Sequence, residues 1–334
     1  MVRRQVSMQD IARNAGVSRS TVSFVLNERT DISIPEETRA RVREAARQLG
    51  YRPNVMAQSL AKESTNLIGL VTDIASSPFA GGIINGAQQA AWRLGKFLLI
   101  VSTEGDPARD EAALEMLLER RVEGLIYATQ AHKVVALPSA AREVPTVLAH
   151  CVEESGEFPS VLPDEEQGGF TATRHLIEAG HQRIALINLD TAMPAARLRE
   201  AGYRRALREA RIEVDDRMIT VGHATANGGF HAARTLLDGG EVPTALFCAN
   251  DRMAMGAYDA IKEAGLHVPD DVSVVGFDNQ EIIAAYLRPA LTTVALPFER
   301  MGAAAVEVLS SVHGSAGCTP LLVPCPLVKR GSVA

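Results

Sequence analysis

The sequence predicts an α/β protein with an N-terminal all-α helix-turn-helix headpiece and a larger body of two subdomains with parallel sheets. Three observations support this prediction. Residues 8–27 have the spacing of two short helices around a tight turn. From residue 66 the pattern changes to alternating apolar strands and amphipathic helices. The chain has 334 residues, which is enough for two or three domains.

The first two helices are predicted from residues 7–27. Ser7 and Asp10 form a capping-box pattern, and the first helix carries its apolar residues at helical spacing. Gly16 suits the sharp turn, and Ser18 suits the cap of the second helix. In that second helix one face is apolar, with Val22, Val25 and Leu26. The opposite face carries Arg19, Ser20, Ser23, Phe24 and Asn27 and is free to enter a major groove.

A third helix is predicted over about residues 35–49. Ser33 and Glu36 resemble a second capping box, with Pro35 in the first turn. Tyr51-Arg52-Pro53-Asn54 then stops the helix, and residues 55–64 form a segment too short to be a stable helix alone in water. Three short helices with few apolar residues suit a small binding domain and not an enzyme.

Charge is divided unequally along the chain. Residues 1–62 contain eleven basic and six acidic side chains, a net charge of +5, so residues 63–334 carry −11 of the overall −6. A basic head on an acidic body suits a small domain that faces phosphates.

The body alternates strands and helices from residue 66 to the end. Its strands are continuous apolar runs, which is typical of parallel sheets covered on both faces: 66–74, 96–103, 123–129, 145–151, 183–189, 244–250 and 271–277. Ligands of open α/β sheets bind beyond the carboxyl ends of the strands. Several polar residues occupy such ends and are expected to form a polar ring in an apolar cleft: Ser76, Ser77, His150, Asn250, Asp251, Asp278 and Asn279.

Composition and motifs exclude several other classes. No apolar run is long enough to span a bilayer, and the N-terminus lacks the apolar core of a secretory signal. The four cysteines have no metal or redox spacing, which predicts reduced thiols in a cytoplasmic protein without a metal site or cofactor. The phosphate-binding and hydrolase motifs of common enzymes are missing from the sequence, so no enzyme is predicted. A transport-type binding protein would suit the body alone, but not the basic headpiece.

With these motifs in place, the chain resembles the LacI/GalR family of transcriptional regulators. In that family residues 51–65 form a hinge helix that orders on the operator, and a leucine from each subunit enters the minor groove. Leu60 matches that leucine, with Asn54 and Ala57 beside it. Arg19 and Ser20 match the positions that read bases, and Phe24 is expected to touch a thymine methyl or a sugar. Phosphate contacts are expected from Ser18, Thr21 and Asn27. A phosphate contact by Arg19 and a core position for Leu60 are the alternatives.

The resemblance also implies effector-binding residues in a periplasmic-binding-protein-like effector domain. They are Phe79, His150, Arg199, Asn250 and Asp278. Ala224 occupies a position where some members carry an aromatic stacking platform. Three alternatives stay open: Asn250 caps a helix, Asp278 is a turn residue, and His150 is a satisfied polar group.

The family architecture divides the chain into residues 1–50, 51–65 and 66–330. The N-subdomain is expected over 66–162 plus 292–320 and the C-subdomain over 164–290, with chain crossings near 162–165, 289–292 and 320–326. The C-terminal tail has no leucine heptads, which favours a homodimer. The resemblance implies a repressor that binds a palindromic operator in double-stranded DNA, controlled by a small molecule such as a sugar, with no membrane partner.

Overall fold

The computed structural model describes residues 6–29, 31–51, 64–73, 80–311 and 319–334. The chain divides into two compact units, residues 1–65 and 66–334. Each unit has its own hydrophobic core.

The headpiece contains α1 (Met8–Ala15), α2 (Arg19–Leu26) and α3 (Glu36–Gln48). The capping box at Ser7 is present, Gly16 ends α1 in the left-handed conformation, and Ser18 caps α2. The expected capping box at Ser33 is wrong. The cap of α3 is Pro35, and in this part of the structure no side chain caps that helix, because a proline side chain has no oxygen to accept from the first N–H groups. The three helices bury Ile11, Val22, Val25 and Val42 between them.

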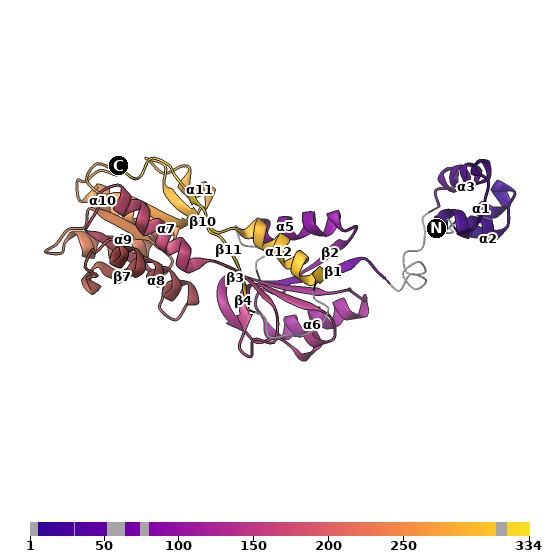
Figure 1. The fold of residues 1–334 in the computed structure, drawn as a ribbon, viewed down its shortest axis with the longest axis horizontal. Helices are drawn as coiled ribbons and strands as arrows, with labels where there is room; N and C mark the ends of the chain where they lie inside the picture. Colours follow the sequence, from indigo (N-terminus) through magenta and orange to yellow (C-terminus); the bar gives the residue numbers. More distant parts are fainter. Residues whose placement is uncertain (1–5, 30, 52–63, 74–79, 312–318) are drawn as a thin grey trace. The chain divides into compact units, whose positions relative to one another are not determined.

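The first sheet of the body is entirely parallel, in the order β11-β5-β4-β3-β1-β2. Its strands are β1 (Leu67–Thr72), β2 (Phe97–Ser102), β3 (Leu125–Val135), β4 (Thr146–Glu153), β5 (Ser160–Pro163) and β11 (Leu321–Val323). Helices α5 (Ala80–Arg93) and α12 (Phe298–Ser311) pack side by side on this sheet (Figure 1). Helix α6 (Pro107–Glu119) and the turn η1 (Ser139–Arg142) pack against a separate core cluster.

The second sheet has the order β12-β10-β9-β8-β6-β7 and is parallel except for β12. Its strands are β6 (Ile184–Asn188), β7 (Ile219–Val221), β8 (Ala245–Cys248), β9 (Ser273–Asp278), β10 (Thr292–Ala295) and β12 (Leu327–Val328). Its helices are α7 (Glu165–Glu178), α8 (Pro194–Glu209), α9 (Ala226–Leu237), α10 (Asp251–Glu263), α11 (Glu281–Ala284) and the turn η2 (Asp216–Met218). Helix α7 packs against α8, and α9 against α10.

The chain passes between the two sheets three times, and one expected crossing is wrong. The first crossing joins β5 to α7 and the last joins β11 to β12, where they were expected. The second was expected at 289–292, but β10 pairs with β9 and belongs to the second sheet. The second crossing therefore lies between β10 and α12. Residues 292–295 accordingly belong to the C-subdomain and not to the N-subdomain. In the described part of the chain no helix is long and apolar enough to cross a membrane.

Candidate functional site

Helix α2 of the headpiece presents the polar face expected from the sequence. Val22 and Val25 are buried, while Arg19 and Ser20 are exposed and Phe24 is half-buried. The hydroxyls of Ser18 and Thr21 lie 2.9 Å apart, and Ser18 Oγ accepts the Thr21 N–H at 3.0 Å. The start of α2 is thus held by its own side chains and leaves Arg19 and Ser20 available for a ligand.

Two more expected DNA contacts lie on the same helix or at its end. Asn27 Nδ2 donates to Ser23 Oγ at 3.3 Å, which joins these two polar side chains. Asn54, Ala57 and Leu60 lie outside the described residues.

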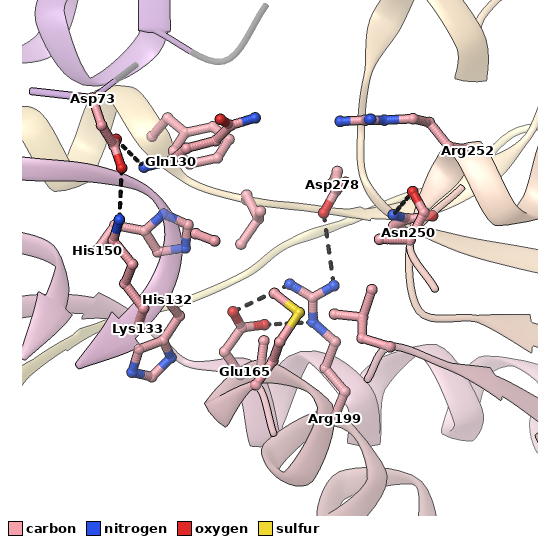
Figure 2. A pocket seen from close by; sticks show the side chains of 17 residues that line it. Asp73, Gln130, His132, Lys133, His150, Glu165, Arg199, Asn250, Arg252 and Asp278 are labelled. Carbon is pink, nitrogen blue, oxygen red and sulfur yellow. Dashed lines mark hydrogen bonds and ion pairs between the residues drawn. The ribbon is translucent and has the colours of Figure 1, made fainter. Parts of the chain in front are cut away.

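The body contains a cavity of about 370 Å³ lined by residues of both sheets and the helices that follow them. Of the five expected effector residues, His150, Arg199, Asn250 and Asp278 line it together, and Ala224 lies there as well (Figure 2). Phe79 lies outside the described residues. His150, Asn250 and Asp278 were expected together from the strand-end rule, and Arg199 was expected with them from the family resemblance.

Arg199 on α8 is the best-anchored side chain of this cavity. Its Nε donates to Glu165 Oε2 at 2.6 Å, and its Nη2 donates to Glu165 Oε1 at 3.1 Å. Its Nη1 bonds the carbonyl of Ala249. The same nitrogen lies 3.7 Å from Asp278 Oδ1 (Figure 2). The guanidinium also stacks on the Phe277 ring at 3.7 Å. A planar cation held in this way is oriented before any ligand arrives.

Asp278 ends β9 in a backbone conformation that non-glycine residues rarely adopt. Its φ is 104°, and the next residue, Asn279, has a φ of 54°. Burial raises the pKa of Asp278 to about 6, although the nearby Arg199 lowers it. Such strain and such a shift at a cavity wall are typical of a binding residue.

His150 is buried, and it also has a left-handed φ, of 64°. Burial lowers its pKa to about 4, so the ring is neutral at physiological pH. Nδ1 lies 3.2 Å from the carbonyl oxygen of Thr129. Because a carbonyl oxygen only accepts, Nδ1 carries the proton and Nε2 is a hydrogen-bond acceptor.

Asn250 has two structural bonds in addition to its place in the cavity. Its Oδ1 accepts the Met253 N–H at 2.8 Å and so caps α10, and its Nδ2 donates to the Ala224 carbonyl at 3.2 Å. The capping interpretation is therefore correct, and it does not exclude a ligand contact.

The comparisons with known proteins cover both units. Residues 7–54 match the family model of bacterial regulatory proteins of the lacI family. Residues 65–331 match the model of periplasmic binding proteins and sugar binding domains of the LacI family. The chain belongs to the LacI family.

Individual LacI-family relatives align over nearly the whole chain. The ribose operon repressor of Escherichia coli (strain K12) is 37% identical over 305 residues, 91% of this chain and 92% of that protein. The regulator GalR of Salmonella typhimurium (strain LT2) is 35% identical over 332 residues, 98% of this chain and 96% of the relative. The solved Lac repressor dimer bound to operator and the anti-inducer ONPF is 32% identical, with a TM-score of 0.80 over 99% of this chain and 100% of the other. The present chain is accordingly a transcriptional regulator of this family and not an enzyme.

The cavity of this LacI-family chain also contains charged and polar residues that the sequence analysis did not select. These are Asp73, Gln130, His132, Lys133, Glu165 and Arg252. Asp73 accepts from Lys133 Nζ at 2.7 Å and from the Gln130 N–H at 2.8 Å, which joins the end of β1 to the part of β3 beyond its pairing with β1 (Figure 2). Asp73 directly follows β1, but the strand predicted from the sequence ran to residue 74, so the strand-end rule did not select Asp73.

His132 and Glu165 carry weaker sequence signals. His132 lies in an irregular part of β3, where the register with β4 shifts between Ala128 and Lys133. Its ring is 5% exposed, and Nδ1 is buried without a hydrogen-bond partner among the described residues. In the sequence Glu165 is one of three consecutive acidic residues, and in the structure it lies at the start of α7 and is fully buried as the partner of Arg199.

Proposed function

We propose that this LacI-family chain is a repressor that binds a palindromic operator as a homodimer in the cytoplasm. A small uncharged polyhydroxyl compound, such as a sugar, binds in the body cavity and controls operator binding. The observation that carries the proposal is that one chain contains both a DNA-recognition helix and a ligand-sized cavity. An exposed polar recognition helix is followed by a body whose two sheets both supply polar side chains to one cavity.

The DNA-binding part of the proposal rests on α2. Arg19 and Ser20 are exposed and reach base edges in the major groove, with Phe24 beside them. Ser18, Thr21, Ser23 and Asn27 contact phosphates or support those that do. Asn54, Ala57 and Leu60 contact the minor groove from the hinge segment, and this stays a prediction from the family pattern.

The homodimer is supported by exposed apolar side chains on the body. Four lie on or beside α5 and β2: Trp92, Leu94, Phe97 and Ile100. Two more, Ile282 and Tyr286, lie at or just after α11. Patches of this kind mark protein interfaces, and a dimer places two recognition helices on the two halves of a palindrome.

The charges in the cavity support an uncharged effector. Lys133 is paired with Asp73, and Arg199 with Glu165 and Asp278. With Arg252, the cavity lining has three cations and three carboxylates. A charged ligand would leave one of these groups uncompensated, whereas hydroxyls donate to carboxylates and accept from cations. The acceptor Nε2 of His150 and the unpartnered Nδ1 of His132 add two further positions for hydroxyls. A ribose-bound LacI-family regulator from Enterococcus faecium is a solved relative, 25% identical to this chain.

The test is selection of palindromic duplexes from a random pool by the full-length protein at physiological salt, followed by gel shifts. We expect Arg19→Ala to weaken binding to the selected duplex by about tenfold to a hundredfold, because one bidentate base contact contributes about 1–3 kcal/mol. The matched control is Arg174→Ala, which removes the same charge from an exposed pair on α7. If no palindrome is enriched by the wild-type protein, the repressor function is rejected.

The effector arm uses the same duplex. A thermal-shift screen of sugars identifies ligands that raise the melting temperature. We expect such a ligand to change operator affinity in the wild type but not in Arg199→Ala, whose operator binding without ligand is retained. An undiminished response in Arg199→Ala would remove this arginine from the effector site.

A further inference from the structure

The backbone turn at Asp278 and Asn279 must be held in its conformation by neighbouring residues. Asp278 and Asn279 both have positive φ, at 104° and 54°, and neither is glycine. Two successive strained residues persist only where the surrounding structure holds them. The turn lies at the cavity wall, so whatever holds it also sets the direction of the Asp278 carboxylate.

One support comes from beneath the turn. Asp251, at the start of α10, is completely buried. Its Oδ2 accepts the Gln280 N–H at 2.6 Å, and its Oδ1 accepts from Thr293 Oγ1 on β10 at 2.6 Å. This carboxylate ties the end of the turn to α10 and β10.

The second support comes from the C-terminal segment of the chain. Arg330 follows β12 and extends its guanidinium between the turn and the loop before β10. Nη2 donates to Asn279 Oδ1 at 2.8 Å, and Nη1 donates to the Leu291 carbonyl at 2.8 Å. The Arg330 N–H donates to Thr292 Oγ1 at 2.8 Å, which fixes the backbone of the segment to β10.

We propose that Arg330 is a positioning residue for the effector site: it holds Asn279 and thereby directs Asp278 into the cavity. The inference rests on the proposed function, because it takes the cavity as the effector site. Arg330 is not one of the residues found lining that cavity, so it acts through the turn.

Arg330 also lies close to the last crossing of the chain between the two sheets. The residues between β11 and β12 form the last crossing between the two sheets, and Arg330 lies two residues beyond β12. Arg330 therefore joins the end of this crossing to the turn that carries Asp278.

The first experiment needs neither effector nor operator. Hydrogen exchange by mass spectrometry on the full-length protein is compared for peptides that span 278–284 and for peptides from β6 and β8. We expect Arg330→Ala to speed exchange in the turn peptide by about tenfold, the loss expected for a charge-assisted hydrogen bond, with β6 and β8 unchanged. Lys329→Ala is the control, because it removes the same charge from the neighbouring exposed residue.

A double-mutant cycle then tests the route through Asn279. If Arg330 acts on the turn through that side chain, Asn279→Ala accelerates exchange at least as much as Arg330→Ala, because alanine also tolerates the positive φ less well than asparagine. Adding Arg330→Ala to Asn279→Ala then gives no further acceleration. Asn279→Asp, which keeps an acceptor for the guanidinium, retains slow exchange in the turn. An unchanged turn in Arg330→Ala, or an equal acceleration throughout the second sheet, overturns the positioning role.

The second experiment uses D-ribose as the probe, measured by calorimetry, together with gel shifts. We expect Arg330→Ala to weaken ribose binding by about tenfold and to leave operator binding without ribose unchanged. An equal loss in Lys329→Ala contradicts the proposal. If the wild-type protein binds no ribose or no palindrome, only the proposed ligand or function fails, and the exchange experiment decides the role of Arg330.

Discussion

Asp278, which we propose as an effector-binding residue, opposes stability at neutral pH. Its folded-state pKa of about 6 is above the ordinary value of 3.8 because the side chain is buried. Between these two values the folded protein holds a proton that the unfolded chain has lost. The contribution of Asp278 to stability therefore falls as pH rises through this window and stays low at neutral pH.

Asp278→Asn should consequently stabilise the protein at pH 7.5, by about 1–2 kcal/mol, and much less at pH 4. The amide still accepts from Gln280 Nε2, which lies 3.1 Å from Asp278 Oδ2. Thermal melts at both pH values measure the effect, with the exposed Asp238→Asn as control. We expect the stabilised variant to lose its response to effector. Equal melting temperatures for Asp278→Asn and wild type at pH 7.5 would contradict the argument.

Glu165→Gln should have the opposite effect on stability. It leaves the buried cation Arg199 without its bidentate partner, and breaking a buried pair destabilises by about 3–5 kcal/mol. Urea unfolding at pH 7 measures the change. Glu178→Gln on the same helix is the matched control, because its pair with Arg174 is exposed and should contribute less than about 1 kcal/mol. Similar losses in both variants would show that burial of the pair has no energetic consequence.

At the scale of elements, the helices of the body pack in pairs that meet at glycines. A Cβ at Gly169 or Gly202 would overlap the backbone of the opposite helix in the α7–α8 pair. Gly229 and Gly256 have the same relation in the α9–α10 pair, as have Gly86 and Gly302 in the α5–α12 pair. Each pair approaches closely enough that the backbones touch.

Gly202→Ala should therefore lower the free energy of unfolding by about 1–3 kcal/mol, because the added methyl meets the Glu166 carbonyl and the helices must separate. Denaturant titration of the full-length protein measures this. Gly240→Ala is the control, since no atom lies within 4 Å of its added Cβ. If Gly202→Ala is as stable as Gly240→Ala, the helices separate without loss of stability.

The elements themselves were largely predictable from the sequence, and the places where prediction failed have physical reasons. Long apolar strands such as β1 and β9 can be recognised from their local sequence pattern alone. Strand β10 has four residues and was not recognised, so the second chain crossing was expected too early. In the cavity, Asp278 was found because it ends β9. His150 was expected at a strand end as well, but β4 continues beyond it to Glu153. Glu165 and His132 were missed because a helix start and a strand irregularity acquire their roles only when α8 and β4 pack against them.

At the scale of the whole molecule, each subdomain of the body carries an exposed apolar patch among its described residues. Phe97 on β2 is 59% exposed, and Ile282 and Tyr286 beside the second sheet are 72% and 70% exposed. Side chains of this size are rarely left in water in clusters unless a partner covers them. A symmetric dimer would cover both patches with their own copies, since a two-fold axis pairs each surface with itself.

The double variant Ile282→Glu with Tyr286→Asp should then convert the dimer into monomers, because four carboxylates would face one another across the two-fold interface. Sedimentation at micromolar concentration measures the assembly state. Val242→Glu is the matched control: it charges an apolar residue of the same unit that is 41% exposed and belongs to neither patch. Operator affinity should fall together with dimerisation, because a monomer contacts only one half-site. If the double variant remains dimeric and binds the palindrome as the wild type does, this surface is not the interface. The patch of Trp92, Leu94, Phe97 and Ile100 would then have to supply the contact.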